Sequence, residues 1–78
     1  MTTADLHGRE PQVQVVLNGQ SCVVASSTTL DGLLALMGVE RRGVAIAVDG
    51  QVVPRSAWPD SPLVDGARVE VVTAAAGG

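Results

Sequence analysis

The sequence predicts an α+β domain in which one main helix packs on one face of a mixed sheet of four or five strands. Three observations predict this class: segments of alternating valines separated by turn pairs, one segment with apolar residues at helical spacing, and a length of only 78 residues. A chain this short buries only about 60% of the surface that its unfolded form exposes. We therefore expect one small domain that is not itself an enzyme.

The composition excludes several classes of function. Five arginines, no lysine and eight acidic residues give a net charge of -3, whereas binding to nucleic acid needs a concentrated basic surface. One cysteine and one histidine can form neither a disulfide nor a Cys/His cluster, so no metal site is expected. The sequence contains neither a recognisable secretory signal nor a membrane span, which predicts a cytoplasmic location without membrane contact.

The first part of the chain predicts a hairpin. Residues 1–11 are polar and lack periodicity, so we expect a disordered N-terminal lead. The next residues, QVQVVL, alternate polar and apolar side chains as a strand does, and Asn18-Gly19 tolerates the positive φ angles of a type I′ turn. A β-hairpin is therefore predicted over residues 12–25.

One amphipathic helix should follow the hairpin. Its apolar stripe has residues at i, i+3, i+4 and i+7: Leu30, Leu33, Leu34 and Met37. Thr28 is the predicted N-cap, Asp31 completes a short capping box, and Gly38 can end the helix.

A second hairpin and a last strand complete the expected elements. Residues 44–48 form a strand, Asp49-Gly50 a turn, and residues 51–53 a return strand stopped by Pro54. Residues 55–62 are expected to form a loop.

The final strand should span residues 68–73, after a turn at Asp65-Gly66, and lie parallel to the first strand in the middle of the sheet. This order is a ubiquitin-like β-grasp over residues 12–73, followed by a flexible Gly-Gly tail at residues 74–78. The predicted core consists of Val13, Val15, Leu17, Leu30, Leu33, Leu34, Met37, Ile46, Val48, Val69 and Val71.

The C-terminal Gly77-Gly78 carries the chemistry. Because glycine has no Cβ, Gly77 is expected to let an extended tail enter a narrow channel. The tail would then deliver the carboxylate of Gly78 to another protein's active site. A carboxylate is inert at neutral pH until attack on the α-phosphate of ATP makes it an acyl adenylate that a nucleophile can displace.

A resemblance to a known family covers the chain from Gln12 onward. It rests on VAIAVDGQVVPRSAW (residues 44–58), Leu63, Asp65-Gly66, VEVV (residues 69–72) and the terminal Gly-Gly. These residues closely resemble the thiamine-biosynthesis sulfur carrier proteins. The VVPR…W block is the specific part, because the related small subunit of molybdopterin synthase shares the fold and the tail but usually lacks that block.

The resemblance implies a mechanism and partners. A ubiquitin-activating-type adenylyltransferase would adenylate Gly78 with ATP, and sulfur from a persulfide donor such as a cysteine desulfurase would convert it to a thiocarboxylate. Thiazole synthase would then take the sulfur into the thiazole ring. The chain itself would bind no cofactor.

Two alternatives remain open from the sequence. One is a sulfur carrier of molybdopterin or cysteine biosynthesis, and the other is a non-catalytic ubiquitin-like interaction module whose glycines are only a flexible end. The chain departs from the family pattern at Ala67, where a second acidic residue is common, in its three alanines before Gly77, and in its longer lead.

The sheet face away from the helix is the expected docking surface for partners. Val72 on the last strand and Val16 on the first point away from the core and should lie close together, with Ala45 and Ala47 flanking them. An apolar patch on an exposed sheet face of a small acidic protein usually marks an interaction site.

Other residues that could carry chemistry are interpreted as structural. Cys22 lies on a predicted strand and is expected to be an ordinary small strand residue, not a persulfide carrier. Trp58 is expected to close one edge of the core. Arg41, Arg42 and Arg55 are expected to be solvated surface residues.

Overall fold

The structure, a computed structural model, describes residues 11–73. In chain order its elements are β1 (Gln12–Leu17), β2 (Gln20–Ala25), α2 (Leu30–Met37), β3 (Val44–Val48), β4 (Gln51–Val53), the 3-10 helix η1 (Arg55–Asp60) and β5 (Arg68–Thr73). Apart from Pro11, the predicted lead and the predicted tail lie outside the described residues, so their flexibility stays a prediction.

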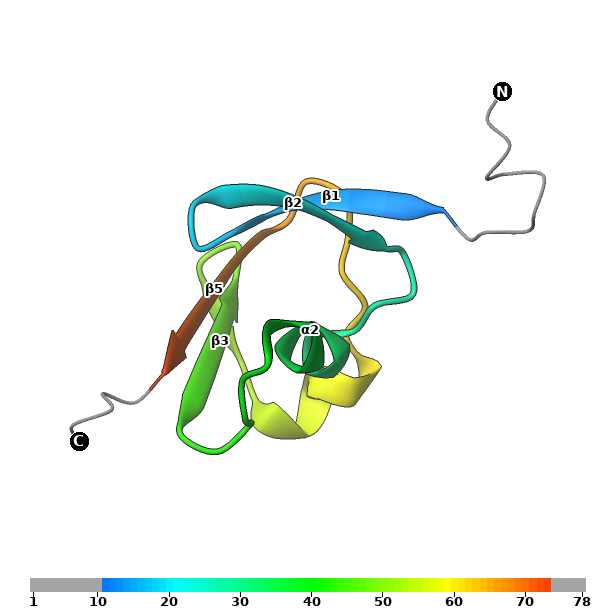
Figure 1. Cartoon of the computed structure of the whole chain (residues 1–78). Helices are drawn as coiled ribbons and strands as arrows, with labels where there is room; N and C mark the ends of the chain where they lie inside the picture. The colour runs from blue at the N-terminus through cyan, green and yellow to red at the C-terminus, as the bar shows by residue number, and fades with distance from the viewer. Residues whose placement is uncertain (1–10, 74–78) are drawn as a thin grey trace, which may run out of the picture.

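The five strands form one mixed sheet in the order β2-β1-β5-β3-β4. Only the central pair, β1 with β5, is parallel among the described strands. Figure 1 shows the sheet curving around α2, which lies on one side of it. The predicted fold class is therefore confirmed, including the position of the last strand beside the first.

The two hairpin turns follow from their residue pairs. Asn18 and Gly19 have φ angles of 49° and 87°, and Asp49 and Gly50 have φ angles of 51° and 85°. Positive φ at both central positions defines the type I′ turn, whose twist matches that of the flanking strands. Each two-residue loop therefore fixes the register of its own hairpin.

The helix starts one residue later than predicted. Thr29, not Thr28, is the N-cap: its backbone is extended and its Oγ1 accepts a hydrogen bond of 3.1 Å from the N–H of Gly32. Thr28 still belongs to the connection, because its N–H donates to the carbonyl of Ala25 and its carbonyl accepts from Leu63. The prediction of Gly38 as the residue that ends the helix is confirmed by its φ of 73°.

The segment predicted as a loop contains the 3-10 helix η1. The N–H of Ala57 donates to the carbonyl of Pro54, and the hydroxyl of Ser61 donates to the carbonyl of Ala57. A 3-10 helix of this length needs no long apolar stripe. The sequence of η1 therefore lacks the apolar periodicity that predicts an amphipathic α-helix. The single buried residue of η1, Trp58, packs it onto the core.

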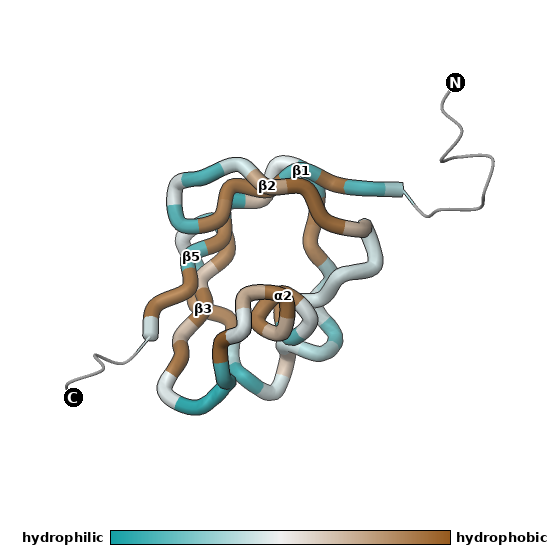
Figure 2. Tube along the Cα trace, viewed as in Figure 1, coloured by the Kyte–Doolittle hydropathy of each residue, from teal (hydrophilic) through white to brown (hydrophobic). Residues whose placement is uncertain are grey.

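The core lies between α2 and the inner face of the sheet. Figure 2 shows mostly hydrophobic stretches along the strands and α2, with hydrophilic residues at turns. Seven predicted core residues are buried: Val15, Leu30, Leu33, Leu34, Ile46, Val69 and Val71. The other four pack against them while partly exposed: Val13, Leu17, Met37 and Val48. Trp58, expected at the edge of the core, is also buried, and the buried residues that the prediction missed are Val24, Leu63 and Ala67.

Candidate functional site

The strand that leads into the C-terminal segment lies in the centre of the sheet. β5 has β1 on one side and β3 on the other, and its Val69 and Val71 are 0% and 7% exposed. Its last residue, Thr73, pairs with Val44 at the start of β3. Gly77 and Gly78 lie outside the described residues. The structure therefore fixes the base of the tail and its direction up to Thr73.

An apolar patch lies on the outer face of the sheet next to this base, and the exposed Glu70 borders it opposite Ala47. Val72 is 62% exposed and lies opposite Ala45 on β3. Ala47, two residues further along β3, lies opposite Val52, which is 74% exposed. We call Ala45, Ala47, Val52 and Val72 the outer patch.

Val52 was not predicted to lie on the docking surface, although the sequence indicates its position. The two-residue turn at Asp49-Gly50 fixes the register of its hairpin, so Val52 must face the same side as Ala47.

The predicted place of Val16 beside Val72 is wrong. Val16 does face away from the core, but the parallel register puts it opposite Arg68, four residues before Val72. At a rise of about 3.3 Å per residue, the two valines are about 13 Å apart along the sheet. β1 pairs only with the first residues of β5, because it turns away into its hairpin after Leu17. Val16 is therefore not part of the outer patch.

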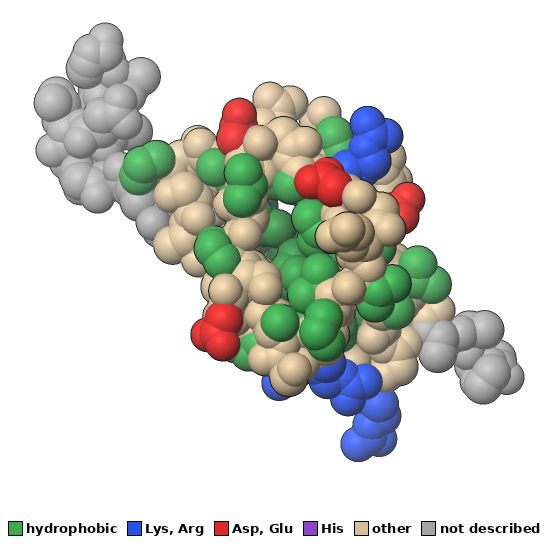
Figure 3. All heavy atoms as spheres, turned by 180° about the vertical axis from the view of Figure 1, so that it is seen from behind, with side chains coloured by type: hydrophobic (Ala, Val, Ile, Leu, Met, Phe, Trp, Pro, Cys, Tyr) green, Lys and Arg blue, Asp and Glu red, His purple; other side chains and the backbone are tan. Residues whose placement is uncertain are grey.

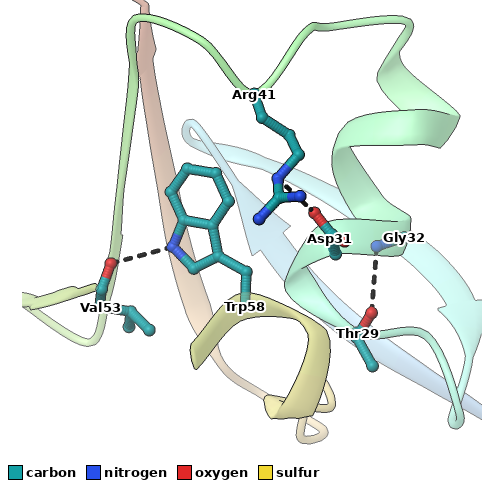
Figure 4. A network of polar contacts seen from close by, with 6 residues as sticks. All are labelled: Thr29, Asp31, Gly32, Arg41, Val53 and Trp58. Carbon is teal, nitrogen blue, oxygen red and sulfur yellow. Dashed lines mark hydrogen bonds and ion pairs between the residues drawn. The ribbon is translucent and has the colours of Figure 1, made fainter. Parts of the chain in front are cut away.

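Trp58 is a packing residue, as predicted. Its side chain is 1% exposed, and its Nε1–H donates a 2.9 Å hydrogen bond to the carbonyl of Val53 (Figure 4). The guanidinium groups of Arg41 and Arg55 each lie 5.9 Å from the centre of its ring. The indole thus links η1 to β4 through its hydrogen bond, and both guanidinium groups lie over its ring.

The arginines are exposed, as expected, but Arg41 has a partner within the chain. Its Nε lies 3.1 Å from Oδ1 of Asp31 in the first turn of α2 (Figure 4). The loop after α2 is thereby tied to the start of the same helix. Because half of the Arg41 side chain is exposed, solvent screens this ion pair, and its net contribution to folding stability is small.

Cys22 lies on β2 directly opposite the buried Val15, half-buried and packed against the core. Within residues 11–73 no three His, Cys, Asp or Glu side chains are arranged to hold a metal ion. In the same range, no helix is long and apolar enough to cross a membrane.

A hollow of about 240 Å³ opens beside the start of α2. Figure 3 shows it from behind, with hydrophobic side chains gathered around it. Its lining includes Leu30, Val48, Leu63 and Ala67. Val48 pairs with Val69 at the end of the sheet away from Thr73, so the hollow is remote from the base of the tail.

These features define a class of protein: a ubiquitin-like β-grasp domain whose last strand is central in the sheet and is followed in the sequence by three alanines and Gly-Gly. Comparison with known proteins then gives the family. The model of the ThiS family matches residues 11–78, the terminal glycines included. The chain belongs to the ThiS family.

Two curated relatives and one solved structure agree with this family. The chain is 30% identical to the sulfur carrier protein ThiS of Escherichia coli over 66 residues, which cover 85% of this chain and all of that protein. It is 32% identical over 66 residues to a thiazole synthase of Paramagnetospirillum magneticum, but spans only 20% of that protein's length. The crystal structure of the thiamine biosynthesis protein ThiS from Geobacter metallireducens matches with a TM-score of 0.71 at 28% identity, covering 85% of this chain and all of that one.

Proposed function

We propose that this chain is a sulfur carrier of thiamine biosynthesis whose reactive group is the carboxylate of Gly78. The observation that carries the proposal is the family match, which runs from the first strand through the terminal Gly-Gly. The E. coli relative that it covers in full is named a sulfur carrier protein. This match favours thiamine biosynthesis over the molybdopterin and cysteine pathways, which the sequence left open.

The chemistry needs no side chain of the carrier itself. A carboxylate oxygen of Gly78 attacks the α-phosphate of ATP, and pyrophosphate leaves. A persulfide sulfur of the donor then attacks the acyl carbon, and AMP leaves. Reduction of the resulting acyl disulfide by a second thiol releases the thiocarboxylate. Gly77 lets the tail pass through the narrow channel that leads to the adenylating site.

Three partners follow from this chemistry. A ubiquitin-activating-type adenylyltransferase consumes ATP, a persulfide donor such as a cysteine desulfurase supplies sulfur, and thiazole synthase accepts it. The thiazole synthase of P. magneticum supports the last assignment, because a segment similar to this chain occurs within that protein.

The outer patch is the proposed docking surface for these partners. It lies at the end of the sheet from which the tail leaves, since Val72 immediately precedes Thr73 and pairs with Ala45. A partner that covers Val72 and Val52 would bury two exposed apolar side chains and at the same time receive the tail in its active site.

Deletion of Gly78 tests the proposal. The truncated chain should keep its fold, measured by circular dichroism, because the core ends at Val71. It should fail to support thiazole formation when adenylating enzyme, sulfur donor and thiazole synthase are supplied. Normal thiazole formation by the truncated protein would refute a mechanism based on the terminal carboxylate.

A further inference from the structure

The strand β5 continues beyond the last residue that pairs with its neighbour β1. The β1 register covers only Arg68 and Val69, and the last backbone bond from that side runs from the N–H of Asn18 to the carbonyl of Val69, at 2.9 Å. Asn18 then adopts a φ of 49°, and the chain turns into the β1–β2 hairpin. Figure 1 shows this hairpin turn beside β5.

The side chain of Asn18 continues the pairing where the backbone of β1 stops. Its Oδ1 accepts a 2.8 Å hydrogen bond from the N–H of Val71, and its Nδ2 donates a 3.2 Å hydrogen bond to the carbonyl of Val71. A primary amide carries the same donor and acceptor as a peptide group. The Asn18 side chain therefore makes the two hydrogen bonds to Val71 that the backbone of one further β1 residue would make.

Val71 is the last buried residue before the tail. It is 7% exposed, whereas the next residue, Val72, is 62% exposed. Thr73 pairs with Val44 on the β3 side, but the described part of β1 does not extend that far on the other side. The amide of Asn18 is thus the contact on the β1 side that lies nearest to the base of the tail.

We infer that Asn18 is a positioning residue for the reactive tail: it clamps β5 at Val71, so that the tail leaves the sheet in one direction. The inference rests on the proposed function, because positioning matters only if the tail is delivered to a partner. Without the clamp, the end of β5 frays and samples more conformations. Docking must then order that segment, which weakens binding but leaves the chemical step unchanged.

The chain offers a matched control at the other end of β5. Asp49 is the first residue of the second type I′ turn, with a φ of 51°. Its Oδ1 accepts a 3.0 Å hydrogen bond from the N–H of Arg68, and its own N–H donates to the carbonyl of Arg68. Asp49 therefore holds the start of β5, away from the tail, with one side-chain bond and one backbone bond, whereas Asn18 holds its end with two side-chain bonds.

The experiment compares Asn18→Gly with Asp49→Gly in the full chain. Glycine accepts the left-handed conformation in both turns, so each variant removes one side-chain clamp without backbone strain. Hydrogen exchange measured by NMR should speed up roughly tenfold at the Val71 amide in Asn18→Gly, and not in Asp49→Gly. Asn18→Asp keeps an acceptor for the Val71 N–H and should recover part of the protection. An Asp variant that protects Val71 no better than the Gly variant, or unchanged exchange in Asn18→Gly, overturns the clamp.

The functional part is tested by ATP–pyrophosphate exchange with the adenylyltransferase. For Asn18→Gly we expect KM for the carrier to rise roughly threefold to tenfold with kcat unchanged, and for Asp49→Gly we expect parental values. Fast exchange at Val71 with an unchanged KM would overturn the positioning role while leaving the clamp. A parental chain that is not adenylated at all would refute the proposed function, and the positioning role with it; the exchange data would still decide the clamp.

Discussion

Trp58 shows how much a single side chain contributes in a small domain. It is the only aromatic residue of the chain, and its burial to 1% exposure places the largest apolar side chain in the core. Its Nε1–H satisfies the carbonyl of Val53 at the end of β4. Burying the indole without such a partner would cost the desolvation of its N–H group. The tryptophan of the VVPR…W block is therefore explained by packing, and partner binding is not needed to account for it.

Cys22 provides a prediction at the same scale. Cys22→Ser should leave sulfur loading intact, because the proposed chemistry takes place on the carboxylate of Gly78. The half-buried position opposite Val15 should make the serine variant less stable by about 1 kcal/mol, since a hydroxyl is poorly solvated there. Loading is measured as thiocarboxylate formed, and stability by urea unfolding. Failure of a folded Cys22→Ser variant to acquire sulfur would place Cys22 in the relay.

At the scale of elements, the helix α2 is too short to be stable without its N-cap and its packing on the sheet. It has only eight residues, and isolated helices of this length are not stable in water. Gly32 within it disfavours the helix by roughly 1 kcal/mol relative to alanine. The Thr29 hydroxyl bonds to the N–H of this same glycine, so the cap satisfies a backbone group in the first turn.

Thr29→Ala should therefore lower the free energy of unfolding by about 1 kcal/mol. Thr28→Ala is the control: no capping bond involves its hydroxyl, and we expect less than about half of that loss. Urea unfolding followed by circular dichroism compares the two variants. A larger loss for Thr28→Ala than for Thr29→Ala would contradict the assignment of the cap.

The elements also show what the sequence could and could not predict. The pairs Asn18-Gly19 and Asp49-Gly50 specify their turns locally, so both hairpins and the registers within them were predictable. The register between β1 and β5 depends on packing between segments that are distant in the sequence. The prediction therefore placed Val16 beside Val72, which is wrong. The bonds from Asn18 to Val71 and from Asp49 to Arg68 were missed for the same reason.

The candidate site divides in the same way. The Gly-Gly end and the outward faces of Val72, Ala45 and Ala47 follow from order and alternation along single strands. The predicted N-cap is off by one residue because adjacent threonines offer the same hydroxyl. The structure decides between them: the Thr29 hydroxyl accepts from the N–H of Gly32, while the backbone of Thr28 bonds to Ala25 and Leu63.

At the scale of the whole molecule, the sheet separates two surfaces. The outer patch adjoins the base of the tail, whereas the apolar hollow beside α2 lies at the other end of the sheet. The chain as a whole carries a net charge of -3. A partner that received the tail at the proposed docking surface would contact the outer patch and the neighbouring Glu70, on a molecule whose overall charge is negative.

Docking on the outer patch predicts the effect of a charge placed there. Val72→Asp should weaken binding to the adenylyltransferase roughly tenfold or more, because docking would bury an unpaired carboxylate. Val23→Asp is the matched control: Val23 is similarly exposed, at 58%, but lies on β2 outside the outer patch. Calorimetric titration measures both affinities. Equal weakening by the two variants, or none by Val72→Asp in a folded protein, would show that docking uses another surface.

The central claim is that the terminal carboxylate of Gly78 carries the sulfur. Intact-mass spectrometry of the chain, after incubation with ATP, the adenylyltransferase and a persulfide donor, tests it most directly. We predict a product in which one oxygen is replaced by sulfur, and fragmentation should place that sulfur on Gly78. A product with sulfur on Cys22, or a chain whose mass is unchanged while the same enzymes load a known ThiS protein, would contradict the claim.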